Sequence, residues 1–165
     1  MQAITDTRHL TVQTLPPILV LTGEDVGQFE WLKKDILKKI GYDPSDLNYS
    51  YFDMKEASYA EVELDLVSLP FFADEKIVIL DHLLDLTTAK KRNLTDEDLK
   101  QFENYLENPS ESTRLVIFAE GKLDSKRRLV KLLKRDAQII EATTPKEQEV
   151  KRYFASQAQE LGLQF

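Results

Sequence analysis

The sequence predicts an α/β fold: a five-stranded, mainly parallel sheet with helices on both faces. Two observations support this prediction. Short apolar runs typical of buried strands alternate with longer segments whose apolar residues recur every three or four positions, as in amphipathic helices. Turn and capping residues separate these segments. Since strand–helix–strand units cross in a right-handed sense, successive strands are expected to lie parallel.

The first half of the chain is expected to hold three strands and two helices. A polar arm, residues 1–17, ends in two prolines and precedes a domain that fills residues 18–165. The strands are expected at residues 18–21, 49–52 and 76–81. The helix between the first two strands should end at Gly41, which accepts a positive φ. Ser58 and Glu61 predict a capping box at the start of the second helix.

The second half continues the alternation after a polar connection at residues 82–93. Thr95 is expected to cap the next helix, and Leu94 and Leu99 have the spacing of a hydrophobic staple. Further strands are expected at residues 114–119 and 137–142, with a helix between them that opens at Asp124 or Ser125, and a final helix is expected from Thr144 onward.

Composition limits the classes of function. The 165 residues, 42% of them hydrophobic, suffice for one domain with a core. A net charge of −7 argues against nucleic-acid binding through the overall charge, although a local basic face remains compatible with it. The absence of cysteine excludes disulfides and thiolate metal sites and fits a reducing cytoplasm. No apolar run approaches the ~20 residues of a membrane span, so no membrane contact is predicted.

The loop after the first strand does not match a phosphate-binding loop. Gly23 and Gly27 lie closer together than the GxxxxGK[ST] pattern requires, and no lysine–hydroxyl pair follows them. Glu24 and Asp25 would repel a polyphosphate. A degenerate nucleotide-binding enzyme therefore remains only a third hypothesis.

Asp81, at the end of the third predicted strand, permits two interpretations. It caps or turns the end of the strand, or it is the phosphoacceptor of a receiver-like regulatory domain, with Glu24 and Asp25 holding magnesium and Lys146 as the charge partner. No nucleophile, base and orienting group can be assigned together, and no metal or cofactor site is predicted.

One predicted helix is strongly basic. The candidate contact residues on it are Lys126, Arg127, Arg128 and Lys131. They form either a solvated helix face or a minor contact to DNA or to an acidic partner, and the sequence leaves both open.

Two adjacent phenylalanines occupy what should be a surface loop between the second helix and the third strand. The segment comprises Leu69, Pro70, Phe71 and Phe72. Pro70 ends the helix and stiffens the turn, so these side chains cannot all follow the helix stripe into the core. Phe72 could still lean inward toward the strand. We interpret the segment as a tip that docks onto a partner protein.

Several motifs together resemble the delta subunit of bacterial DNA polymerase III, in its N-terminal domain. They are Leu19 to Glu24, Leu69 to Val78, Tyr105 to Pro109, and Gly121 to Asp124 with the basic helix after it. The resemblance implies an AAA+-like (P-loop NTPase-like) core without a functional nucleotide site, with no enzyme activity and no cofactor of its own. By position, Phe71 and Phe72 match the leucine and phenylalanine of the family's hydrophobic plug, with Leu69 one turn back. The chain departs from that pair by carrying Phe71 and by inserting Pro70.

The same resemblance implies the partners. The family binds the beta sliding clamp and helps to open this ring so that it can be loaded on DNA for replication. The gamma/tau and delta prime subunits are expected to bind through C-terminal domains that this chain lacks, and DNA is contacted indirectly within the complex. The apolar ending at residues 163–165 is expected to be a cut through a longer protein.

Overall fold

The structure is a computed structural model that describes residues 15–68, 75–90 and 93–142. Within these residues, strands and helices alternate as the sequence predicts, and the α/β class is confirmed. The elements are, in chain order, β1 (Ile18–Gly23), α2 (Val26–Lys39), β2 (Tyr49–Asp53), α3 (Tyr59–Val67), β3 (Lys76–Asp81), the short 3₁₀ helix η1 (Leu84–Leu86), α4 (Asp96–Glu107), β4 (Thr113–Glu120), α5 (Arg128–Asp136) and β5 (Gln138–Ala142).

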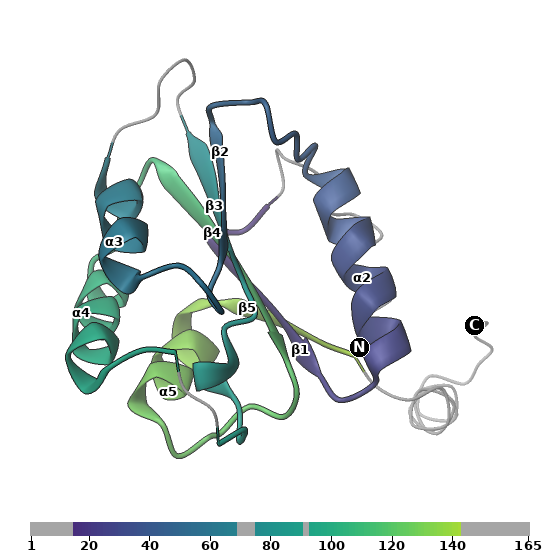
Figure 1. Ribbon diagram of the computed structural model, residues 1–165, viewed down its shortest axis with the longest axis vertical. Helices are drawn as coiled ribbons and strands as arrows, with labels where there is room; N and C mark the ends of the chain where they lie inside the picture. Colours follow the sequence, from purple (N-terminus) through teal and green to yellow (C-terminus); the bar gives the residue numbers. More distant parts are fainter. Residues whose placement is uncertain (1–14, 69–74, 91–92, 143–165) are drawn as a thin grey trace, which may run out of the picture.

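The five strands form one sheet in the order β2-β3-β4-β1-β5, and the strand pairs are parallel. After β1 the chain crosses to the far edge strand β2, and it then returns through β3 and β4 before passing β1 to reach β5. Right-handed connections in opposite directions place their helices on opposite faces. Figure 1 shows this arrangement, with α2 on one side of the sheet and α3, α4 and α5 on the other.

Each face of the sheet has its own hydrophobic core. Beneath α3, α4 and α5, the strands contribute alternate residues such as Val78 and Ile117, and the rings of Tyr59 and Phe102 pack 5.5 Å apart. Beneath α2, the opposite residues of the same strands meet the apolar stripe of that helix. Leu15, which the sequence places in the polar arm, is buried in this second core.

Capping residues explain where the helices begin. The carboxylate of Asp25 accepts the Gln28 N–H at the start of α2. Thr95 and Asp98 form a reciprocal capping box at the start of α4. The Ser58 hydroxyl accepts the Glu61 N–H, the first bond of the box predicted for α3. Gly41 follows α2 with φ of 73°, as predicted.

One prediction about a connecting segment is wrong. The basic helix α5 begins at Arg128 rather than at Asp124 or Ser125, because the Asp124 carboxylate accepts the Lys126 N–H and holds a turn. The connection after β3, predicted to be polar, is partly buried. It contains η1, and the buried Asp85 carboxylate accepts backbone N–H groups of Asn93 and Leu94. The predicted helix from Thr144 lies outside the described residues.

Candidate functional site

The predicted docking tip, Leu69 to Phe72, lies outside the described residues, but the elements on either side of it are described. The side chain of Lys76, at the start of β3, is almost fully buried and points at the end of α3. Its Nζ lies 3.0 Å from Asp65 Oδ1 and 2.5 Å from Ser68 Oγ, and it also donates to the Asp65 carbonyl. The last carbonyls of a helix lack intrahelical donors and favour a cation. Lys76 therefore ties the end of α3 to β3.

A second set of bonds fixes the same place from β4. The Thr113 hydroxyl donates to the Leu66 carbonyl at 3.1 Å, in a buried position. Arg114 and Glu75 form an ion pair at 3.0 Å between the segments that start β4 and β3. Helix α3 is thus held at its C-terminal end by two strands.

The outer side of α3 exposes two apolar side chains near the tip. Leu64 is 72% exposed and Val67 is 58% exposed, whereas Val62 and Leu66 are buried in the core. Sequence reasoning did not single out Leu64 and Val67. Their spacing of three residues, off the buried stripe, was the signal that could have found them.

Parallel-sheet proteins commonly bind ligands at the carboxyl ends of their strands. At the carboxyl end of β1, backbone contacts close this position. Only Glu24 and Asp25 separate β1 from α2. The Gly23 N–H donates to the Gly121 carbonyl at 2.9 Å, and the Gly121 N–H donates back at 2.7 Å. Gly23 has φ of 126°, and a Cβ placed on it would lie 2.2 Å from the Ala142 carbonyl oxygen. The Gly23 N–H, which a phosphate loop could present to a nucleotide, is here bonded to Gly121, directly after β4.

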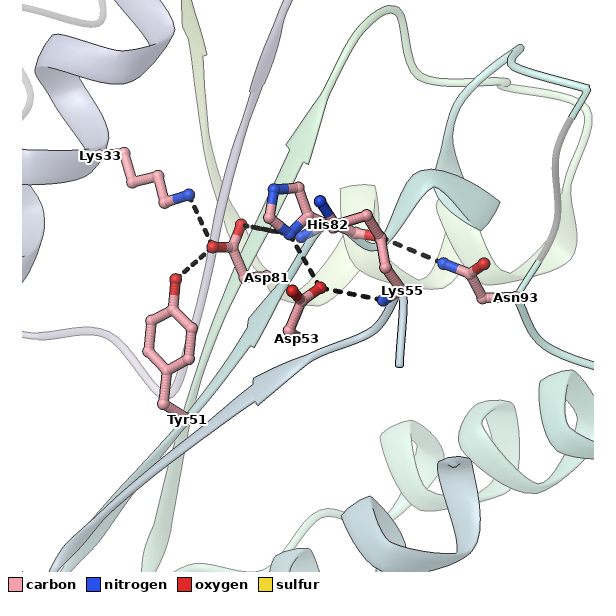
Figure 2. A network of polar contacts seen from close by, with 7 residues as sticks. All are labelled: Lys33, Tyr51, Asp53, Lys55, Asp81, His82 and Asn93. Atoms are coloured by element: carbon pink, nitrogen blue, oxygen red, sulfur yellow. Dashed lines mark hydrogen bonds and ion pairs between the residues drawn. The ribbon is translucent and has the colours of Figure 1, made fainter. Parts of the chain in front are cut away.

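Asp81, at the end of β3, is the centre of a polar network that Figure 2 shows. Its side chain is nearly fully buried, and its Oδ2 lies 2.6 Å from Lys33 Nζ of α2. The Tyr51 hydroxyl donates to the same oxygen, and Oδ1 accepts the His82 backbone N–H at 2.8 Å. Burial first, and the Asp81 carboxylate second, raise the pKa of Tyr51. These contacts match the interpretation of Asp81 as a residue that caps the strand end.

His82 links this network to β2. Its Nδ1 lies 3.0 Å from Asp53 Oδ1, which also accepts the Lys55 backbone N–H at 3.0 Å. Burial raises the pKa of Asp53, but the Lys55 N–H and the His82 ring outweigh it, so this pKa lies below its ordinary value. His82 has φ of 59°, a left-handed conformation that turns the chain sharply after β3.

The strand order contradicts the receiver-like alternative. A receiver of the flavodoxin-like order 2-1-3-4-5 places the first and third strands side by side, so that acids from both can share one ion. Here β4 lies between β1 and β3, which separates Glu24 and Asp25 from Asp81. Asp81 is instead engaged by Lys33 and Tyr51.

The predicted basic contact residues do not form one uniform group. Arg128 pairs with Glu103 and Glu107 of α4, at 3.5 and 3.0 Å, and Arg127 lies 3.6 Å from Asp124. Lys126 and Lys131 are exposed, and among the described residues neither has a carboxylate within 4.0 Å. Arg128 therefore joins α5 to α4, whereas Lys126 and Lys131 are exposed to solvent.

The family model described as DNA polymerase III, delta subunit, matches residues 19–143. The chain belongs to this family. The delta subunit of DNA polymerase III from Bacillus subtilis (strain 168) is 27% identical over 128 residues, which are 76% of this chain and 37% of that protein. This delta-family chain thus spans less than half the length of that curated relative.

Solved structures show the same fold. The DNA clamp loader delta protein of Bacillus subtilis matches with a TM-score of 0.72 and 23% identity, over 91% of this chain and 45% of that one. A gamma-subunit-related protein of DNA polymerase III from Thermotoga maritima matches with a TM-score of 0.54 and 16% identity, over 91% of this chain and 48% of that one. These likenesses show that the chain shares its α/β fold with both structures, as the delta-family resemblance implies.

In residues 15–68, 75–90 and 93–142 no helix is long and apolar enough to cross a bilayer. Within the same ranges, no three histidine or acidic side chains cluster in a way that could hold a metal ion.

Proposed function

We propose that this chain binds the beta sliding clamp through the tip formed by Leu69, Pro70, Phe71 and Phe72 at the end of α3. In doing so it would help to open the ring so that the ring can be loaded on DNA for replication. The observation that carries the proposal is the exposed apolar pair Leu64 and Val67, which lies in the last turns of α3, shortly before Leu69 to Phe72 in the chain. Exposed apolar side chains that lie together are typical of a protein-binding surface.

The anchoring of α3 supports a docking role. Association costs translational freedom and the ordering of loops, about 4–15 kcal/mol in total, so a preorganised binding segment gains affinity. Lys76 and Thr113 hold the end of α3 in place before any partner arrives. Because the end of α3 is already held, binding a partner would require less free energy to order this part of the chain.

The other parts of the proposal concern activity and assembly. We propose that the chain hydrolyses no ATP itself, because the β1–α2 turn holds only two residues and its glycine N–H is bonded to Gly121. The gamma/tau and delta prime subunits would bind through regions outside this chain, since the Bacillus subtilis relative is much longer. DNA would be contacted by the complete loader, in the cytoplasm.

A titration of fluorescently labelled sliding clamp with this chain tests the proposal. Replacing Phe71→Ala and Phe72→Ala together is expected to weaken binding at least tenfold, because aromatic anchors commonly contribute 2 kcal/mol or more to an interface. Leu64→Ala with Val67→Ala should give a smaller loss, roughly three- to tenfold, by the area of apolar surface removed.

The matched control is Val26→Ala with Trp31→Ala, which removes two exposed apolar side chains from α2 on the other face of the sheet. This variant should bind the clamp like the unmodified chain. Equal affinity of the Phe71/Phe72 variant and this control would refute the tip assignment. For the ATP proposal, inorganic phosphate released from ATP by the chain in the presence of magnesium would contradict it.

A further inference from the structure

The α2–β2 turn, residues 40–48, exposes a large apolar side chain beside two acids. Leu47 is 62% exposed, and Asp43 and Asp46 precede it in the turn. In the described ranges, neither carboxylate has a lysine, arginine or histidine nitrogen within 4.0 Å. The turn therefore combines an exposed apolar group with two acids that no cation of the described chain neutralises.

Hydrogen bonds hold this turn in one conformation. The Asp43 carboxylate accepts the Ser45 N–H at 3.0 Å and the Ser45 hydroxyl at 2.9 Å, and the Asp46 carboxylate accepts the Asn48 N–H at 2.9 Å. The Tyr49 hydroxyl donates to the carbonyl of residue 40, directly after α2, at 2.7 Å. The N–H of Ser45 first, and its hydroxyl second, hold the pKa of Asp43 below its usual value. A surface that is ordered in advance loses less conformational freedom when a partner binds.

The turn lies at the edge of the sheet where β2 and β3 begin. The Ile77 N–H donates to the Asn48 carbonyl at 2.9 Å, so the last residue of the turn lies beside the start of β3. Lys76 also joins the end of α3 to this edge. Figure 1 shows the α2–β2 turn and the C-terminal end of α3 at the same end of the sheet, toward the top of the view. Two separate segments therefore bring exposed apolar side chains to one edge.

We propose that the α2–β2 turn is a second contact surface for the sliding clamp. Leu47 would pack against an apolar part of the clamp, and Asp43 and Asp46 would face its basic side chains. The inference rests on the proposed function, because it takes the clamp as the partner of this edge. It adds the chemistry of the clamp surface that the turn would meet, an apolar area with lysine or arginine at its rim.

The size of a protein interface supports a contact beyond the tip. A standard interface involves roughly 20–30 residues on each side, more than the four residues of the tip can supply. Phe72 precedes Lys76 by four residues, so the Cα atoms of these two residues are at most about 14 Å apart. Since Asn48 lies beside the start of β3, a partner that covers this edge reaches the turn.

The charge of the turn argues against two other occupants. A nucleic acid would bring its phosphates against Asp43 and Asp46. A second copy of the chain, related by two-fold symmetry, would bring the same acids against each other. A basic and apolar protein surface suits both the leucine and the acids. Such complementary charges mainly speed association and select the partner.

The test of the apolar contact is a titration of fluorescently labelled clamp with the chain. Leu47→Ala is expected to weaken binding about three- to tenfold, because it removes apolar surface that the clamp would cover. The matched control is Val26→Ala, which removes a side chain of similar exposure, 58%, from the start of α2. This control should change affinity less than twofold. Because Leu47 is exposed, both variants should keep the melting temperature of the unmodified chain.

The test of the charges is the same titration at two salt concentrations. Asp43→Asn with Asp46→Asn removes both charges but keeps an oxygen that can accept the bonds of the turn. This variant should bind about threefold more weakly than the unmodified chain at about 50 mM salt, and the difference should disappear at about 500 mM salt because of screening. Glu24→Gln with Glu30→Gln removes two exposed acids near the start of α2 and should have no such effect.

The outcomes separate this inference from the proposed tip. Loss of affinity in Phe71→Ala with Phe72→Ala, but none in Leu47→Ala, would overturn the inference and leave the tip in place. Loss in Leu47→Ala alone would support the turn and refute the tip. Equal effects of the two acid pairs would make net charge the cause and would overturn the proposed contact with basic side chains. Self-association of the chain that Leu47→Ala abolishes, without a change in clamp affinity, would overturn the inference in favour of a second copy.

A clamp that does not bind the unmodified chain at all would overturn both proposals.

Discussion

Both ends of β3 carry a buried charged side chain, but the two side chains hold different helices. Each carries one charged side chain that is almost fully buried, Lys76 at the first residue and Asp81 at the last. Lys76 holds the end of α3, whose outer side exposes Leu64 and Val67. Asp81 holds Lys33 of α2 and accepts bonds from the Tyr51 hydroxyl and the His82 N–H. A buried ion can therefore hold a helix end that exposes apolar side chains at one end of the strand, and join a helix to the sheet at the other end.

The largest expected effect comes from Asp81→Ala. This change leaves the largely buried ammonium of Lys33 and the partly buried hydroxyl of Tyr51 without their acceptor. Removing one partner of a buried ion pair commonly costs about 3–5 kcal/mol. The free energy of unfolding, measured by urea denaturation, should fall by about that amount, while clamp affinity at a temperature where the variant is folded should not change.

Asp53→Ala is the matched control for this prediction, because Asp53 occupies the paired position on β2 but is about one-third exposed. It should lose 1 kcal/mol or about that, as expected for a partly solvated ion pair. If Asp81→Ala costs no more than Asp53→Ala, then Asp81 does not consolidate the interior and the contrast between the two ends of β3 fails.

Lys76→Met is expected to affect stability less but binding more. Methionine keeps the apolar stem and loses the ammonium that bonds Asp65 and Ser68. Because Asp65 is partly exposed, we expect a loss of about 2 kcal/mol in the free energy of unfolding. The end of α3 should fray, and clamp affinity in the titration should fall several-fold.

Lys100→Met, on the exposed surface of α4, makes the same chemical change without a buried partner and should leave both measurements unchanged. The contrast between the two ends of β3 is supported if Lys76→Met lowers clamp affinity and Asp81→Ala does not. A several-fold loss of clamp affinity in Asp81→Ala as well would show that binding follows overall stability rather than the local anchor.

The sequence predicted most of the fold because apolar periodicity is a local signal. The run from Lys76 to Asp81 and the stripe of Phe29, Leu32 and Ile36 each identify an element without knowledge of the rest of the chain. The strand order could not be predicted from periodicity. The strand order places β4 between β1 and β3. It therefore separates Glu24 from Asp81 and excludes the receiver-like alternative.

The candidate sites show the same limit. The basic residues of α5 look alike in the sequence, but whether Arg128 is free depends on Glu107, 21 residues earlier on a neighbouring helix. Asp85 looked like part of a polar loop, and only the fold shows that its carboxylate is buried against backbone N–H groups. Pairing between distant residues therefore has to be read from the structure.

The smallest expected effect concerns Tyr51 and depends on pH. Burial and the Asp81 carboxylate raise the pKa of Tyr51 above the value of about 10 that a tyrosine has in an unfolded chain. Below pH 10 or so, its hydroxyl is protonated in both states and its bond to Asp81 stabilises the fold by about 1 kcal/mol. Above that pH the unfolded state loses the proton first, so this stabilisation declines as pH rises.

Tyr51→Phe should therefore be less stable than the unmodified chain at neutral pH, and the difference should narrow between pH 10 and pH 12 or thereabouts. The matched control is Tyr42→Phe, which removes the hydroxyl of the ring that packs 5.5 Å from Tyr51 and leaves the Asp81 bond in place. A gap between Tyr51→Phe and the unmodified chain that stays constant across this range would mean that the hydroxyl does not bond Asp81. In that case the Asp81 carboxylate would be held by Lys33 and the His82 N–H without a bond from β2.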